Sequence, residues 1–223
     1  MMYSEGSLEI SLLDQQLVLL PEKAMYWKEF KTLVISDLHL GKSGHFRKHG
    51  IAVPESVNAS NIQRLDVLTR RLTPEKIIFL GDLFHSQYNA EFESFKHWRR
   101  SHAGIDMVLT IGNHDIISRH EFQKTGLECV NTLRMGPFLF MHDESDDQLN
   151  TRTITVSGHI HPAIKLKTKG RQSIYSPCYY IGGTNILLPA FGTFTGTFLV
   201  EPKQNDRVFA VVEDKVINVS TLV

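Results

Sequence analysis

The sequence predicts an α/β fold in which two β-rich layers pack together and helices cover the outer faces. Two observations lead to this fold class. In the first half of the chain, short apolar runs typical of buried strands alternate with stretches whose apolar residues recur at helical spacing. In the second half, strand-like runs follow one another with short turns between them. Alternating strands and helices predict a parallel sheet, and consecutive strands predict a second β-rich layer beside it.

The first half opens with strand signals. LEISLL and QLVLLP lie on either side of Asp14-Gln15 and alternate well enough to predict a hairpin. AMYWKEF, residues 24–30, predicts a further edge strand. TLVIS, residues 32–36, then predicts the first buried strand, and KIIFL and DMVLT predict two more.

Two helices are predicted between these buried strands. Residues 54–72 carry apolar side chains at helical spacing behind Pro54, a residue suited to a first helical turn. In residues 90–103, Phe92, Phe95 and Trp98 form an apolar stripe at three-residue spacing. The strands of the second half are expected in the segments FLFMH, TITVSGHIHP, QSIYSPCYYIG, GTFLVEP, RVFAVVED and KVINVSTLV.

Length and composition limit the class of protein. The chain has 223 residues, 42% of them hydrophobic, and no repeat, low-complexity tract or Pro/Gly/Ser-rich linker, so we expect a single domain over residues 1–223. Lysine plus arginine equals aspartate plus glutamate at 24 each. This balance excludes an overall field that attracts nucleic acid or a membrane, although a local basic patch is enough to contact phosphates.

Neither secretion nor membrane insertion is predicted. The start MMYSEGSLEISLLDQQ lacks a charged region followed by an apolar one, and no apolar run approaches the roughly 18 residues of a membrane span. Cys129 and Cys178 do not make a disulfide framework for a chain of this length, and Cys178 is expected to be a buried small hydrophobe. We therefore expect a soluble cytoplasmic protein with no membrane partner.

Ligand-type side chains follow five of the predicted strands. They are Asp37 and His39, Asp82 and His85, Asn113 and His114, His142, and His159 and His161. Sites in α/β sheets assemble at the carboxyl ends of strands, so we expect these side chains to converge. Gly81, Gly112 and Gly158 let the backbone turn tightly beside them.

The chemistry of these side chains predicts a pair of metal ions. No thiolate lies near them, which makes a zinc-finger or iron–sulfur site a poor fit, whereas carboxylate, amide oxygen and imidazole suit Mn, Fe or Zn. The set is too large for one tetrahedral ion and suits two ions that share a carboxylate. Two such ions activate a water and stabilise an in-line phosphoryl displacement, so the pattern predicts hydrolysis of a phosphate ester.

Each motif alone has a plainer explanation. Asp-X-His and Gly-Asp occur in many solvated turns, since aspartate is a favoured turn residue. GNHD and GHIHP are more specific, because a turn has no ordinary need of two imidazoles. The motifs taken together, in this order and at strand ends, favour a metal centre over packing.

The motifs DLHLG, GDLFH, GNHD, His142 and GHIH, which span Asp37 to His161, resemble those of the calcineurin-like metallophosphoesterase superfamily in the same order. The resemblance implies a four-layer αββα sandwich. It also implies two metal sites that share Asp82 and a metal-bridging hydroxide as the nucleophile. One site would be formed by Asp37, His39, Asp82 and His161, and the other by Asp82, Asn113, His142 and His159. His114 would protonate the leaving oxygen or stabilise the transition-state charge, with His85 as a candidate to assist it.

A narrower resemblance points to nucleic acid. Ser/Thr phosphatases of the superfamily carry a second aspartate where His85 stands, whereas GDLFH is similar to the motif of Mre11-type nucleases. LHLGKSGHFRKHGIAVP, GDLFHS, GHIHPAI, SPCYY and LPAFGTFTG are similar to the bacterial ligase-associated DNA damage response endonucleases. The resemblance implies a manganese-dependent DNA phosphodiesterase that works with a DNA ligase, a helicase and an exonuclease.

Two other functions stay open. The first is hydrolysis of small nucleotides, as by a cyclic-nucleotide phosphodiesterase or a nucleotide pyrophosphatase. The second is a non-catalytic scaffold, which the complete set of motif histidines disfavours. Whether DNA is cut internally or from an end, and whether the chain forms a homo-oligomer, the sequence leaves open.

Basic residues outside the motifs are candidates for phosphate contact. A cluster after the first motif comprises Lys42, His45, Arg47, Lys48 and His49, with Phe46 as a core aromatic or a base-stacking residue. Arg99-Arg100 and the alternating Lys165, Lys167 and Lys169 are expected on exposed faces, the lysines with a minor role in substrate binding. DESDD after His142 is expected to be a solvated loop.

Overall fold

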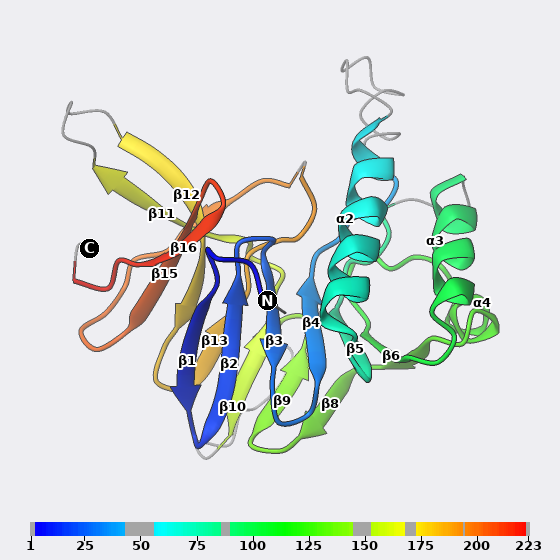
Figure 1. Ribbon diagram of the computed structural model, residues 1–223, viewed down its shortest axis with the longest axis horizontal. Coiled ribbons are helices and arrows are strands. Elements are labelled where there is room, and N and C mark those ends of the chain that lie inside the picture. The colour runs from blue at the N-terminus through cyan, green and yellow to red at the C-terminus, as the bar shows by residue number, and fades with distance from the viewer. Residues whose placement is uncertain are drawn as a thin grey trace.

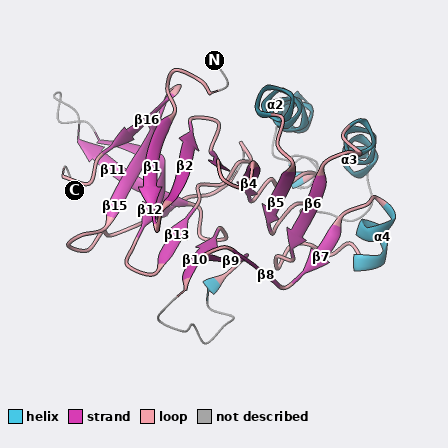
Figure 2. Cartoon of the chain, turned by 60° about the horizontal axis from the view of Figure 1, so that its bottom comes forward, coloured by secondary structure: helices cyan, strands magenta, loops and turns pink. Residues whose placement is uncertain are grey.

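The computed structural model describes residues 3–42, 56–85, 90–144, 153–167, 173–193 and 195–221, with the backbone alone for 56–59 and 90. Two β-sheets pack face to face, and helices lie on the outside of the first (Figures 1 and 2). The helices are α2 (Ser56–Leu72), α3 (Ala90–Ser101) and α4 (Arg119–Lys124). None of the described helices is both long and apolar enough to cross a bilayer.

The first sheet follows the order of the chain. Its strands are β1 (Leu8–Leu12), β2 (Gln15–Leu20), β3 (Ala24–Trp27), β4 (Thr32–Ser36), β5 (Lys76–Leu80), β6 (Asp106–Thr110) and β7 (Glu128–Val130). Strands β1 to β4 pair antiparallel, and β4 to β7 pair parallel. The carboxyl ends of β4, β5 and β6 therefore meet at one edge.

The second sheet has nine strands in the order β14-β11-β12-β13-β10-β9-β8, with β15 paired to β12 and β16 to β15. They are β8 (Thr132–Met135), β9 (Phe138–Met141), β10 (Ile154–Ser157), β11 (Pro162–Lys167), β12 (Ser173–Ile181), β13 (Asn185–Leu187), β14 (Phe198–Leu199), β15 (Arg207–Val212) and β16 (Lys215–Asn218). Strands β9 and β10 are parallel, so their carboxyl ends also meet at one edge.

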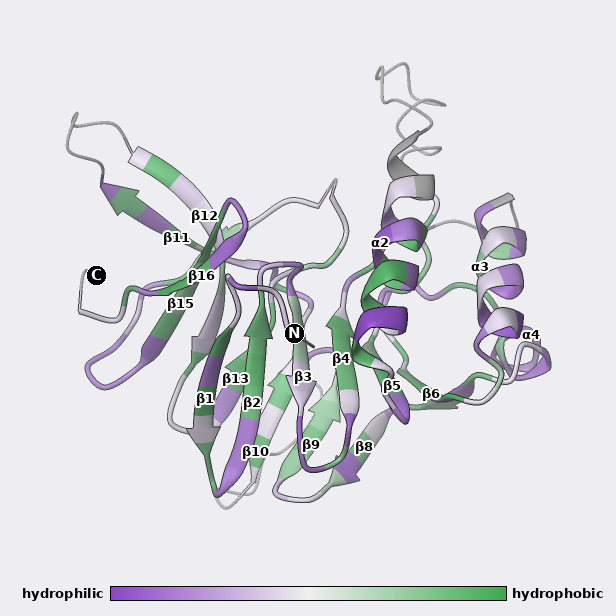
Figure 3. Cartoon of the chain, in the orientation of Figure 1, coloured by the Kyte–Doolittle hydropathy of each residue, from purple (hydrophilic) through white to green (hydrophobic). Residues whose placement is uncertain are grey.

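Alternation along the strands builds two apolar layers around the first sheet. In β4, Leu33 and Ile35 pack toward the helices, and Val34 between them packs toward the second sheet, as expected when successive side chains point to opposite faces. Figure 3 shows hydrophobic residues along β2 and β4, where both faces are covered. Burial on both faces explains why these strands are continuous apolar runs.

The two sheets are joined by aromatic contacts. Trp27 of β3 meets the edge of Phe138 of β9, with ring centroids 5.0 Å apart. The buried Tyr179 hydroxyl of β12 lies 2.7 Å from Leu20 O and 2.8 Å from Ala24 O, so a fully buried polar group is satisfied across the interface.

The predicted fold class, a mixed α/β fold with two packed sheets, is confirmed. Among the described residues, helices cover the first sheet only. On the outer face of the second sheet, Cys178, Val208 and Ala210 pack with Val219 and Val200 from the segments after β16 and β14. Cys178 is buried as predicted, and burial raises the pKa of its thiol to about 12.

Several element predictions need correction. The edge-strand prediction for residues 24–30 is wrong, because β3 lies between β2 and β4 with a partner on each side. Arg99, expected to be exposed, is 8% exposed and donates hydrogen bonds to His102 O and Gly126 O. The predicted helix at 54–72 is described from Ser56, and Pro54 lies outside the described residues.

Candidate metal centre

The strand ends of both sheets bring the predicted side chains together. Asp37 follows β4, Asp82 follows β5, and Asn113 follows β6 in the first sheet, while His142 follows β9 and His159 follows β10 in the second. The segments after β4 and β5 stay paired beyond the sheet, since His39 N donates to Asp82 O at 2.9 Å and Leu40 N to Leu83 O at 2.9 Å. Ligand-type side chains thus converge from both sheets at one edge of the sandwich.

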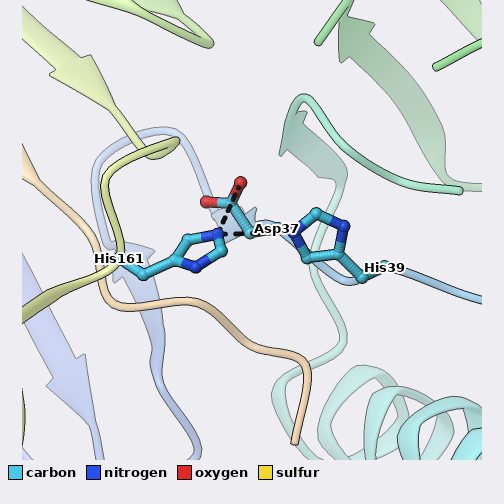
Figure 4. A group of neighbouring side chains, drawn as sticks. All are labelled: Asp37, His39 and His161. Carbon is cyan, nitrogen blue, oxygen red and sulfur yellow. Dashed lines mark hydrogen bonds and ion pairs between the residues drawn. The ribbon is translucent and has the colours of Figure 1, made fainter. Parts of the chain in front are cut away.

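The first group consists of Asp37, His39 and His161, which Figure 4 shows pointing toward one another. Their ligand atoms lie within 4.8 Å of one another. His161 Nε2 is 3.3 Å from Asp37 Oδ1 and 3.3 Å from His39 Nε2. Asp37 and His39 are almost fully buried, whereas His161 is partly exposed.

The second group consists of Asp82, His142 and His159, whose ligand atoms also lie within 4.8 Å of one another. His142 Nε2 is 3.0 Å from His159 Nδ1 and 3.0 Å from Asn113 Oδ1, so the amide of Asn113 completes this group. Asp143 Oδ2 lies 3.6 Å from His159 Nε2 at the outer side.

Asp82 connects the two groups. Its Oδ2 lies 3.7 Å from His39 Nε2 of the first group, and its Oδ1 lies 3.5 Å from His142 Nε2 of the second. One carboxylate therefore faces both groups, which is the geometry of a residue shared by two ions. The two groups have the arrangement of a binuclear metal centre.

Hydrogen bonds to backbone carbonyls orient the rings of His142 and His161 so that each Nε2 faces its group of ligand atoms. His142 Nδ1 is 3.0 Å from Leu80 O, and His161 Nδ1 is 2.9 Å from Gly196 O. A carbonyl only accepts, so both Nδ1 atoms carry a proton, and in the neutral imidazole, the form that ligates a metal, Nε2 is the acceptor. Such outer hydrogen bonds are typical of metal-ligating histidines.

Facing acceptors show that the two groups fit cations. When both imidazoles are neutral, His142 Nε2 faces Asn113 Oδ1 and His161 Nε2 faces Asp37 Oδ1 as pairs of acceptors. Among the described residues, buried Asp37 Oδ1 has no hydrogen-bond donor. A buried acceptor costs free energy unless it is satisfied, and a divalent ion satisfies several at once.

Electrostatics keep the first group in its ligand form. Burial lowers the pKa of His39 to about 2, assisted by the charge of Lys42, so its imidazole is neutral near pH 7. Burial alone would raise the pKa of Asp37, but His161, His142 and Ser36 outweigh it and the pKa is lowered. Ser36 Oγ and the backbone N–H of His159, at 3.0 Å, donate to Asp37 Oδ2 and fix the carboxylate.

The backbone at the centre is strained. Asp37, His39, Asp82, His159 and His161 have φ between 47° and 65°, the left-handed region. Non-glycine residues rarely adopt it, at a cost of about 1–2 kcal/mol each. Left-handed residues concentrated in one site suggest that the fold holds them there for function.

Glycines allow the strand ends to approach. A Cβ on Gly81 would overlap the His142 ring, one on Gly112 would overlap Asp82, and one on Gly158 would overlap Ser36 Oγ and Asp37 Oδ2. Gly81 also has a φ of 68°. At Gly112 and Gly158 the requirement is space rather than backbone conformation.

Gly158→Ala is expected to lower the free energy of unfolding by about 1–3 kcal/mol, because the added methyl group displaces Asp37. Thermal unfolding and titration with Mn²⁺ measure the effect, and weaker manganese binding should accompany the lower stability. Gly104→Ala is the matched control, since nothing lies within 4 Å of its added Cβ. Equal behaviour of the two variants would contradict the crowding argument.

Asp115 braces the loops that carry Asp82 and Asn113. Its carboxylate accepts hydrogen bonds from the N–H groups of Leu83, Phe84 and Gly112, at 2.9, 3.2 and 2.9 Å. Burial raises the pKa of Asp115 to about 7, against the effect of these donors. Asp115 is the last residue of GNHD and has no predicted role in the sequence analysis. The signal that could have identified it is a carboxylate in a tight turn after a strand.

His85 and His114 lie together beside the first group. Their ring centroids are 4.6 Å apart, and His39 lies 5.4 Å from the His85 ring and 5.7 Å from the His114 ring. His114 is exposed, and its backbone N–H donates to Asp82 Oδ1 at 2.9 Å. The side chains predicted to assist the leaving group are therefore next to the metal groups.

Of the remaining residues predicted from the sequence to contact phosphate or form loops, some are described by the structure and others lie outside the described residues. Lys42 is half-buried, and the carboxylates of Asp82 and Asp37 offset part of the lowering of its pKa by burial. Its predicted neighbours His45, Phe46, Arg47, Lys48 and His49 lie outside the described residues, as does Lys169. Glu144 of DESDD accepts from Thr155 and Asn185, so this residue is not part of a free loop.

Comparison with known proteins agrees with the geometry. Residues 30–182 match the family model described as calcineurin-like phosphoesterase. Because the match covers more than half of the chain, the protein belongs to this family. It is a metallophosphoesterase with two candidate metal sites. Among curated proteins, no significant match was found.

One of the solved structures that are similar to this chain is that of a nuclease. The crystal structure of the nuclease MPE from Pseudomonas putida is 27% identical and superposes with a TM-score of 0.77, over 95% of this chain and 99% of that chain. A protein of unknown function from Aquifex aeolicus is 15% identical, with 58% and 78% coverage and a TM-score of 0.41. A conserved uncharacterized protein from Streptococcus pneumoniae, described as a phosphoesterase, is 14% identical, with 84% and 94% coverage and a TM-score of 0.37. The last two scores are too low to bear on function.

Proposed function

We propose that the chain is a binuclear metal-dependent nuclease that hydrolyses phosphodiester bonds of DNA, linked to DNA repair. The single observation that carries this proposal is Asp82, whose two oxygens face the two candidate metal groups. Support for nucleic acid as the substrate comes from the likeness to the Pseudomonas nuclease over nearly the whole of both chains.

The proposed ligands divide into two sets that share Asp82. Asp37, His39, Asp82 and His161 hold one ion, and Asp82, Asn113, His142 and His159 hold the other. We propose Mn²⁺, with Fe or Zn as chemically similar alternatives, because the donor set mixes carboxylate, amide and imidazole. When bound, two such ions supply an activated water and neutralise the charge of an in-line phosphoryl displacement.

The protein's own groups orient the reaction. Leu80 O and Gly196 O fix the tautomers of His142 and His161, so that both imidazoles turn a lone pair inward. His114 is exposed beside the first group, and there it would donate a proton to the leaving oxygen while His85 packs against its ring. Lys42 is placed near both carboxylates to contact a phosphate.

Metal removal and substrate choice test this function. Protein stripped by a chelator is expected to lose cleavage of single-stranded DNA, and Mn²⁺ is expected to restore it more effectively than Mg²⁺, since the imidazole ligands suit Mn²⁺ better. Closed circular single-stranded DNA separates internal cleavage, which we propose, from attack at an end.

The alternative is a metallophosphoesterase of small nucleotides. Hydrolysis of a cyclic nucleotide or a nucleotide diphosphate without cleavage of DNA would establish that alternative and contradict the nuclease. Metal binding without hydrolysis of any of these substrates would favour a non-catalytic scaffold. Cooperation with a DNA ligase, a helicase and an exonuclease in the cytoplasm is part of the same proposal.

A further inference from the structure

The hairpin of β11 and β12 has one face that the sandwich leaves uncovered. On β12, Tyr179 and Ile181 are 0% and 3% exposed between the sheets. Tyr175, on the same face by the two-residue period of a strand, is 56% exposed. Figure 1 shows that this end of the hairpin projects beyond the packed sheets. The face of β12 that is buried between the sheets at Tyr179 is therefore exposed to solvent at Tyr175.

Register identifies the side chains of this face. Lys165 pairs with Tyr175, and Lys167 pairs with Ser173 across the antiparallel hairpin. Leu199 of β14, opposite Ala163, adds an apolar residue that is 44% exposed. The Lys165 ammonium lies 6.0 Å from the centroid of the Tyr175 ring, so the two side chains share one face. We call Lys165, Lys167, Tyr175 and Leu199 the hairpin face.

The hairpin face follows the candidate metal centre directly along the chain. β11 begins at Pro162, the residue after His161, and His161 O accepts from Phe198 N at 3.0 Å. Lys165 is four residues after His161, which corresponds to about 13 Å along a strand. A chain whose phosphate lies at the metal centre therefore reaches Lys165 within a few nucleotides.

We propose that the hairpin face binds single-stranded nucleic acid next to the bond that is cut, a proposal that rests on the nuclease function. Its charge matches the ligand, because none of the described residues that register places on this face is acidic. Lys165 and Lys167 suit backbone phosphates, and the exposed Tyr175 ring suits a base. A paired duplex offers no free base face to Tyr175, so a single strand is the occupant.

The test is binding of a fluorescent single-stranded oligonucleotide with phosphorothioate linkages by the manganese-loaded protein. Lys165→Ala with Lys167→Ala is expected to weaken binding about tenfold. It should also reduce the slope of log affinity against log salt by about 1.4, the value for two lost contacts to single-stranded phosphates. Tyr175→Ala is expected to weaken binding about fivefold or more, and Tyr175→Phe is expected to retain it.

Two controls separate this proposal from the metal chemistry and from the fold. Lys31→Ala with Lys76→Ala removes the same charge at the amino ends of β4 and β5, where the carboxylate partners Glu75 and Asp106 are 68% and 79% exposed and such ion pairs contribute little stability. Hydrolysis of bis(p-nitrophenyl) phosphate should stay unchanged in every hairpin variant. If DNA is bound as expected but not cut, the nuclease function fails and the hairpin face stands.

Three results would overturn the proposal. One is an oligonucleotide affinity that the hairpin variants leave unchanged, and another is an equal loss in the Lys31 and Lys76 control. The third is a change of oligomeric state in Tyr175→Ala with unchanged affinity, which would make the face a contact between copies of the chain.

Discussion

Replacing Asp82 with asparagine is expected to reduce turnover at least about a thousandfold and to leave fewer than two ions bound per chain. The change removes the negative charge that faces both groups, at 3.7 Å from His39 Nε2 and 3.5 Å from His142 Nε2. Loss of a partner outside the ligand shell costs 10–100-fold, and loss of the shared ligand should exceed this. Metal analysis after gel filtration and turnover of a phosphodiester measure both effects.

Asp82→Asn tests the negative charge of the side chain while it keeps the shape of the side chain. Asparagine has the shape of aspartate, and its oxygen still accepts from the backbone N–H of His114, so the loop is expected to stay in place. The matched control is Asp106→Asn, whose side chain is 79% exposed at the amino end of β6. Two bound ions and turnover within tenfold of the unchanged protein would show that Asp82 is not shared.

The convergence of the ligand-type side chains could be predicted from the sequence because the determining signals are local. An apolar run that stops at Asp37 or Asp82 identifies both a buried strand and its carboxyl end. Parallel pairing of β4, β5 and β6 then brings these ends to one edge without further information. The convergence of both sheets on this edge follows from the same rule, applied to β9 and β10.

What the sequence could not predict depends on how neighbouring segments fold against one another, which the residue pattern of a single segment does not show. AMYWKEF is predicted to be an edge strand, yet β3 is covered on both sides by β2 and β4. Arg99 reads as a surface residue, yet the loop carbonyls of His102 and Gly126 accept its hydrogen bonds. In both cases the groups that bury the residue, the neighbouring strands or the loop carbonyls, cannot be identified from the hydrophobic periodicity of the segment.

The strained backbone and the buried acceptors both lower the stability of the protein in exchange for a site that is arranged for cations. Left-handed residues and a buried Asp37 Oδ1 without a hydrogen-bond donor both destabilise the metal-free protein. Bound cations satisfy the buried acceptors. They can do so only because the surrounding fold stabilises the left-handed backbone that positions the ligands. Gly158 leaves room for Asp37, and Ser36 and the brace at Asp115 hold the ligands in place before an ion arrives.

His114→Ala is expected to retain both ions and to lose about 10²–10⁴-fold in turnover on DNA. Asp82 is held by the backbone N–H of His114 and not by its ring, so removal of the ring leaves the ligands in position. The ring is exposed and packs against His85 at a centroid distance of 4.6 Å, which places it to meet a substrate.

The leaving group identifies what the ring does. If His114 gives a proton to the departing oxygen, the loss should be large for DNA, whose alkoxide needs the proton, and small for bis(p-nitrophenyl) phosphate, whose phenolate does not. His97→Ala, an exposed histidine of α3, is the control and should leave both rates unchanged. An equal loss on both substrates would assign His114 to stabilising transition-state charge instead, and unchanged rates on both would remove it from the reaction.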